Sequence, residues 1–176
     1  MSGPTSRTRA ARGPFIVIAE LGKADFAWLD GLRRLHYPPD RNRVPAHLTL
    51  FRSLPPSAEP EARRSLSRAA ASPAPRAEIS AAMDLDSGVA LRVSSSELET
   101  IRDQLADEFR GLLTSQDIGR WTAHVTIQNK VEPRVARALL RQVRAQFEPR
   151  PLKIAGLGLV RYVEGVWQPL ASYRFR

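Results

Sequence analysis

His47-Leu48-Thr49-Leu50 is repeated, residue type for residue type, by His124-Val125-Thr126-Ile127. Each tetrapeptide carries a His and a Thr that alternate with two aliphatic residues. In an extended strand alternate side chains point to opposite faces. The aliphatic pair of each copy is therefore expected to enter a core, while His and Thr face a cleft. The chain has three histidines, and two of them occupy equivalent places in these copies.

Bulk composition narrows the class of protein. The 176 residues are 43% apolar, which is enough for a core. There is no cysteine, which excludes thiol chemistry and favours a reducing compartment, and no apolar run reaches the roughly 20 residues of a membrane span. The net charge is +9 and arginine greatly outnumbers lysine, which favours RNA or phosphate esters as partners. The competing explanation for the excess of arginine is a genomic base composition that enriches arginine throughout the protein.

The chain is expected to be one domain, residues 14–176, behind a disordered basic tail, residues 1–13. The tail lacks the apolar stretch of a signal peptide. The domain divides into two halves, 14–75 and 76–150, and a closing hairpin, 151–176. Alternating apolar residues predict strands, and apolar residues at helical spacing predict helices. The expected strands are 15–19, 47–51, 77–85, 89–93, 124–127, 154–163 and 166–175. Two helices are expected to be capped by Asp25 and Ser96, and two to start at Pro60 and Pro133. In the last helix Val135, Leu139, Val143 and Phe147 are expected to face inward, and Arg137, Arg141 and Arg144 to form a solvated face.

Both halves place a strand, a helix, a His-x-Thr strand and a helix in the same order. We therefore expect two units related by a pseudo-twofold axis, with the two His-x-Thr strands facing each other across a groove. One such motif alone would be ordinary in a random chain, but two copies on matching strands favour a functional pair. His36 has no equivalent partner and is expected to be an ordinary residue at a helix C-terminus.

Two histidines across a groove suit paired acid–base catalysis. The pKa of an unperturbed imidazole lies near neutrality, so a neutral His can accept a proton while a protonated one donates. Transfer of a phosphodiester needs both acts on opposite sides of phosphorus, and Thr hydroxyls can donate to its non-bridging oxygens. Two histidines without cysteine or a recognisable carboxylate set make a poor metal site, so no metal is expected.

HLTL at 47–50 and HVTI at 124–127 resemble the paired motifs of the 2H phosphoesterase superfamily, and most of all its bacterial 2′-5′ RNA ligase and cyclic phosphodiesterase branch. The resemblance implies an α+β fold: a duplicated bilobal α/β plan with an antiparallel sheet in each lobe, outer helices and a central groove. It also implies chemistry without metal or cofactor. His47 and His124 become the acid–base pair, and Thr49 and Thr126 hold the phosphate. The order of acid and base stays open.

Five further residues are candidate substrate contacts. Arg52 follows His47 by five positions, and Lys130 follows His124 by six. Arg43 and Arg120 precede the two motifs in loops expected at the groove rim. Tyr162, in the late hairpin, is expected to stack on a base. The simpler alternative for each is a surface cation or a core tyrosine.

The expected function is opening of an RNA 2′,3′-cyclic phosphate to a 2′-phosphate, with reversible 2′-5′ ligation. Two alternatives stay open: cleavage of 2′-5′ oligonucleotides or small cyclic nucleotides, and a non-catalytic protein that binds RNA ends. The expected partners are RNA ends or nucleotide cyclic phosphates. The protein is expected to be a cytoplasmic monomer without membrane association.

Overall fold

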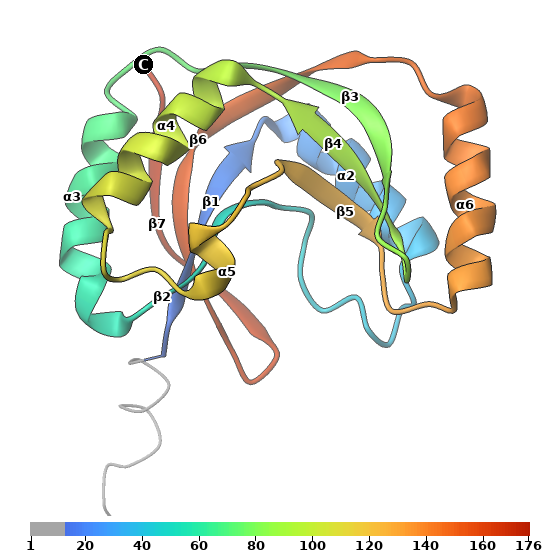
Figure 1. Cartoon of the computed structure of the whole chain (residues 1–176), viewed down its shortest axis with the longest axis horizontal. Coiled ribbons are helices and arrows are strands. Elements are labelled where there is room, and N and C mark those ends of the chain that lie inside the picture. Colours follow the sequence, from blue (N-terminus) through green and yellow to red (C-terminus); the bar gives the residue numbers. More distant parts are fainter. Residues whose placement is uncertain (1–12) are drawn as a thin grey trace, which may run out of the picture.

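The computed structural model describes residues 13–176, which form a curved antiparallel sheet flanked by helices (Figure 1). The strand order is β2-β1-β6-β3-β4-β5, and β7 pairs with β6. The strands are β1 Phe15–Leu21, β2 Leu48–Leu54, β3 Arg76–Asp84, β4 Val89–Ser94, β5 His124–Gln128, β6 Arg150–Val163 and β7 Val166–Arg174. The helices are α2 Lys23–His36, α3 Glu59–Ala69, α4 Ser96–Glu108, α5 Ser115–Ile118 and α6 Pro133–Gln146, with a 3₁₀ turn at Pro56–Ala58.

The long strand β6 makes the sheet continuous. Its residues 150–153 pair with β3, and its residues 154–161 pair with β1. The sequence predicts one antiparallel sheet in each lobe; in the structure the two sets of strands share β6 and form one seven-stranded sheet. The division into two duplicated halves stays a prediction. The predicted tail, apart from Gly13, lies outside the described residues.

The two motif strands lie at the two ends of the strand order, yet β2 contacts β5. The sheet therefore curves until its first and last strands are in contact; Figure 1 shows the curvature. Helices α3 and α4 lie along one side of the curved sheet, and α6 lies far from them on the other side. This curvature brings residues 47–50 and 124–127 together.

Three helix predictions need correction. Helix α2 begins at Lys23 rather than at Asp25, because the Asp25 carboxylate accepts from the backbone N–H of Lys153 at 2.8 Å instead of capping the helix. Helix α4 is capped by Ser95 rather than Ser96: Ser95 Oγ accepts from Leu98 N–H at 3.0 Å. Val135, expected inside, is 42% exposed, because α6 packs through Ala136, Leu139 and Leu140.

Helix α6 does present its arginines to solvent, as expected: Arg137, Arg141 and Arg144 are all exposed. The closing hairpin is confirmed by the pairing of β6 with β7. Within residues 13–176, none of the helices is long and apolar enough to cross a membrane.

Candidate active site

The alternation predicted for the two motifs is present in the structure. Leu48 and Leu50 of β2 are buried, as are Val125 and Ile127 of β5. The intervening His and Thr side chains are partly exposed on the opposite face. Burial of the aliphatic pair fixes the register of each strand, since a slip by one residue would turn His and Thr into the core.

Both histidines are held in the same way. His47 Nδ1 lies 2.8 Å from Pro45 O, and His124 Nδ1 lies 2.7 Å from Thr122 O. A carbonyl oxygen only accepts, so each Nδ1 carries the proton that it donates. Each imidazole therefore keeps Nε2 for a ligand. The bond to the carbonyl two residues earlier also fixes the orientation of the ring.

The pKa of His47 is lowered to about 4. The main cause is burial, which the bond to Pro45 O opposes, and electrostatic interactions with Arg33 and His124 lower the pKa further. The Trp167 ring lies against the imidazole, with centroids 4.9 Å apart, and contributes to the burial. At neutral pH, His47 is therefore unprotonated, as a proton acceptor must be.

Arg33 joins the first half of the chain to the second motif. Its side chain is 2% exposed, and Nη1 donates to Thr126 O at 3.0 Å. Its Nε and Nη2 donate to Asn42 Oδ1 at 3.2 and 3.1 Å, and its guanidinium lies 4.5 Å from the Tyr37 ring centroid. Within residues 13–176 no carboxylate forms a salt bridge with Arg33. A buried cation thus sits beside the pair.

Arg102 makes the reciprocal connection from α4 to β2. It is 6% exposed, donates through Nε to Leu50 O at 3.1 Å and through Nη2 to Asp117 O at 2.8 Å. Trp121 Nε1 donates to Thr49 O at 3.0 Å in the same region. Each terminal strand of the sheet therefore receives donors from the other half of the chain, and these bonds fix the two motifs relative to each other.

A cleft of about 250 Å³ opens beside His47 and brings together three of the five weaker candidates: Arg43, Lys130 and Tyr162. Arg33 and Arg41 add two more cations, and Trp167 adds an aromatic wall. Of the described residues that line this cationic cleft, none is Asp or Glu. Four cations without a carboxylate make the cleft a site for an anion.

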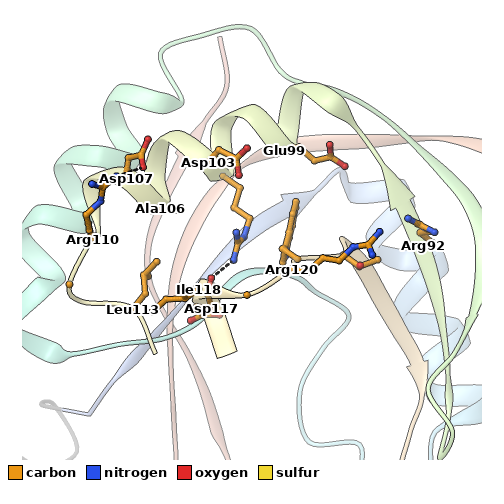
Figure 2. A pocket seen from close by; sticks show the side chains of 15 residues that line it. Arg92, Glu99, Asp103, Ala106, Asp107, Arg110, Leu113, Asp117, Ile118 and Arg120 are labelled. Carbon is orange, nitrogen blue, oxygen red and sulfur yellow. Dashed lines mark hydrogen bonds and ion pairs between the residues drawn. The ribbon is translucent and has the colours of Figure 1, made fainter. Parts of the chain in front are cut away.

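Arg120 lies elsewhere, in a larger pocket of about 720 Å³ beside α4 (Figure 2). Glu99, Asp103 and Asp107 project from α4 over this α4 pocket, and Arg92 faces it from β4. Its lining holds four arginines and four carboxylates: Arg92, Arg102, Arg110, Arg120, Glu99, Asp103, Asp107 and Asp117. The charges balance, so this pocket is a weaker site for a polyanion than the cationic cleft.

Arg52 is placed by an irregularity in β2. Val17 pairs with Phe51 while Ile18 pairs with Thr49, so Leu50 and Phe51 are both buried and the alternation shifts by one. The exposed Arg52 consequently emerges on the face that carries Thr49 rather than on the core face. Its backbone N–H donates to the buried Asp117 carboxylate at 2.9 and 3.0 Å, which ties α5 to β2.

Sequence reasoning missed four residues that contact the motif strands or His47: Arg33, Arg102, Trp121 and Trp167. Arg33 follows the buried Leu29 by four residues, and Arg102 follows the buried Leu98 by four. An arginine at a core-facing helical position was the available signal, because such a residue needs acceptors inside the protein. The signal does not identify those acceptors, which are backbone carbonyls of the other half.

The family model of the 2′-5′ RNA ligase superfamily matches residues 22–166. TT0787 of Thermus thermophilus has a similar structure, with a TM-score of 0.64 and 16% identity. E. coli LigT, solved in complex with 3′-AMP, has a TM-score of 0.61 and 15% sequence identity to this chain. A further solved phosphoesterase has a TM-score of 0.57 and 18% sequence identity. Each alignment covers 93% of this chain and 98% of the other. These three likenesses show a shared fold. Comparison with curated proteins gives no match.

Proposed function

Since the chain belongs to the 2′-5′ RNA ligase superfamily, we propose that it is a metal-independent phosphodiesterase that opens RNA 2′,3′-cyclic phosphates to 2′-phosphates. We propose that it also performs reversible 2′-5′ ligation, in which a 5′-hydroxyl replaces water as the nucleophile on the same cyclic phosphate. The observation that carries this proposal is the matched pair of Nδ1–carbonyl bonds at His47 and His124. They leave two Nε2 atoms, one on each of two contacting strands, for the two proton transfers.

The proposed step has His47 as the base and His124 as the acid. Neutral His47 takes a proton from water through Nε2 as the water oxygen bonds to phosphorus. The P–O3′ bond breaks, and His124 donates its proton to the departing O3′. The product carries a 2′-phosphate and a 3′-hydroxyl. The lowered pKa of His47 supports this order, because it keeps His47 neutral.

Thr49 and Thr126 are the proposed phosphate holders. Each stands two residues after its His on the same strand face, and both side chains are partly exposed. Their hydroxyls would donate to the non-bridging oxygens as negative charge grows there. Arg33, beside this position, supplies a buried positive charge that an anionic substrate would balance.

The rest of the substrate is proposed to enter the cationic cleft. Arg43 and Lys130 would contact backbone phosphates, and Tyr162, which is 39% exposed, would stack on a base as the strand leaves. Arg52 and Arg120 stay candidates for more distant contacts. The 3′-AMP in the LigT structure supports a nucleotide substrate for this fold. The expected monomeric state and cytoplasmic location stay predictions.

The test is turnover of a nucleoside 2′,3′-cyclic phosphate in the presence of a chelator, with the product isomer identified. The proposal expects a 2′-phosphate from the parent and a loss of several orders of magnitude in His47→Ala and in His124→Ala. Arg137→Ala, on the exposed face of α6, serves as the control. Turnover that survives both His substitutions would refute the paired mechanism. A parent that binds RNA ends but turns over neither cyclic phosphates nor 2′-5′ linkages would favour the non-catalytic alternative.

A further inference from the structure

A second cavity opens beside His47, with a volume of about 380 Å³. It shares His47 and Trp167 with the cationic cleft, but its walls differ. Ile18, Phe26 and neighbouring apolar residues form most of its surface, and no Lys or Arg is among the described residues that line it. We call it the apolar pocket. Its lining suits an aromatic heterocycle rather than a phosphate.

The one carboxylate in the lining of the apolar pocket, as far as the described residues go, is Glu20 of β1. Ala19 pairs with Leu48, so the next position along each strand places Glu20 opposite His47 on the same face of the sheet. Both side chains line the pocket. A ligand whose phosphate lies at His47 and whose base enters the pocket would therefore have Glu20 in the wall of the same cavity, with its carboxylate directed over β6 toward Ser172 of β7.

Strand β6 leaves room for this carboxylate. A Cβ atom at Gly158 would come within 2.7 Å of Glu20 Oε1, and one at Gly156 within 3.0 Å of Oε2. Two glycines in the interior of a strand cost packing and conformational entropy. At Gly156 the backbone carbonyl of Tyr173 would lie nearer still, at 2.5 Å, so it is Gly158 in particular that leaves the space occupied by the Glu20 carboxylate.

The carboxylate of Glu20 has unused acceptor capacity. Oε2 accepts from Ser172 Oγ–H at 2.7 Å, whereas an ionised carboxylate can accept about four hydrogen bonds. Burial raises the pKa of Glu20, and the Ser172 bond and Arg174 partly oppose that rise. The proposed acid–base pair is His47 and His124, and Glu20 lies outside it on β1. It is available to bind a ligand.

We propose that the apolar pocket receives the base of the reacting nucleotide and that Glu20 selects guanine, an inference that rests on the proposed function. The Watson–Crick edge of guanine presents two adjacent donors, N1–H and N2–H. Adenine and cytosine present one donor beside an acceptor, and uracil presents one donor between two acceptors. A carboxylate only accepts, so guanine is the base that it satisfies best. Trp167 and Phe26 supply aromatic contact for the base.

The test is a binding measurement that needs no turnover. Affinities for guanosine 2′-monophosphate and adenosine 2′-monophosphate are compared by calorimetry for the parent, Glu20→Gln and Glu78→Gln. Glu78 is an exposed glutamate of β3 and serves as the matched control. The parent and the control are expected to bind the guanosine form about tenfold tighter or more. Glu20→Gln keeps the shape and an acceptor for Ser172, and should bring the ratio close to one.

Equal affinities in the parent, absence of binding of either nucleotide, or an unchanged ratio in Glu20→Gln would overturn the guanine pocket. Turnover of the corresponding cyclic phosphates separates this inference from the proposed function. Guanine-selective binding without turnover would refute the proposed phosphodiesterase activity and support guanine selection by the apolar pocket. Turnover without any guanine preference would support the proposed phosphodiesterase activity and refute guanine selection by the apolar pocket.

Discussion

Replacement of Arg33 by Met tests whether a buried cation controls the reactivity of His47. The change removes the donor to Thr126 O and both bonds to Asn42 Oδ1, while it keeps most of the side-chain volume. It also removes one of the charges that lower the pKa of His47. We therefore expect two separate consequences, one for stability and one for the pH dependence of catalysis.

The stability change is set mainly by Thr126 O. Loss of a hydrogen bond from a charged donor costs about 1.5–3 kcal/mol. Asn42 Oδ1 loses the same donor, but removal of a guanidinium that is 2% exposed also removes its desolvation penalty. The net expectation is a decrease of about 2 kcal/mol in the free energy of unfolding, measured by urea titration. Displacement of β5 should also lower kcat/KM at neutral pH by about 10- to 100-fold.

The pH profile carries the sharper expectation. In the proposed step His47 acts only when neutral, so the acid limb of kcat/KM is expected to follow its pKa, about 4 in the parent. Without the Arg33 charge this pKa rises toward its ordinary value, and the acid limb moves to higher pH. Burial still lowers the pKa, so the move is partial. Arg33→Lys retains the charge without the planar fork, and should lose rate while its acid limb stays near that of the parent.

The matched control is Arg34→Met, because Arg34 is the next residue of α2, its side chain is 71% exposed, and it forms a 3.8 Å ion pair with Asp30. This variant should retain the stability and pH profile of the parent within error. An acid limb that stays in place or moves to lower pH in Arg33→Met would refute the electrostatic role of Arg33. An acid limb that moves equally in Arg34→Met would show that total charge, not the buried position, is responsible.

Three further predictions follow from the same geometry. The pKa of His47 is lower in the folded than in the unfolded chain, so the unfolded chain binds more protons at acid pH. The free energy of unfolding should therefore fall by about 2–3 kcal/mol as the pH decreases from about 6.5 to about 4. Urea titrations of the parent and of His47→Asn, in which this loss should be absent, check the prediction. Arg102→Met should lower the free energy of unfolding by about 3 kcal/mol through its two lost carbonyl bonds, yet leave the acid limb in place, and a shifted limb would contradict this. Lys130→Ala should weaken RNA binding similarly for all sequences and reduce the slope of log affinity against log salt by about one, whereas Arg137→Ala should not; equal slopes in both variants would count against the cationic cleft.

Much of the local structure was predictable from the sequence. Alternation of His and Thr with aliphatic residues places the polar pair on one face of a strand, because the period of a strand is two. The same reasoning located the closing hairpin and the four longer helices to within a few residues. The errors occurred at caps, where Asp25 bonds to Lys153 instead of its own helix. A capping residue and a tertiary acceptor look identical in sequence.

The sequence by itself determined which side chains could act together, since two copies of one short pattern carry their own periodicity and core face. Only the tertiary structure decided how they meet. The curvature of the sheet brings β2 against β5, and β6 joins the strands into one sheet. The irregularity in β2 turns Arg52 outward, and Arg33 reaches a carbonyl 93 residues away. Strand pairing, the irregularity in β2 and the bond from Arg33 all involve backbone N–H and C=O groups. Every residue carries a backbone carbonyl, so the pattern of side chains does not show which of these groups will pair.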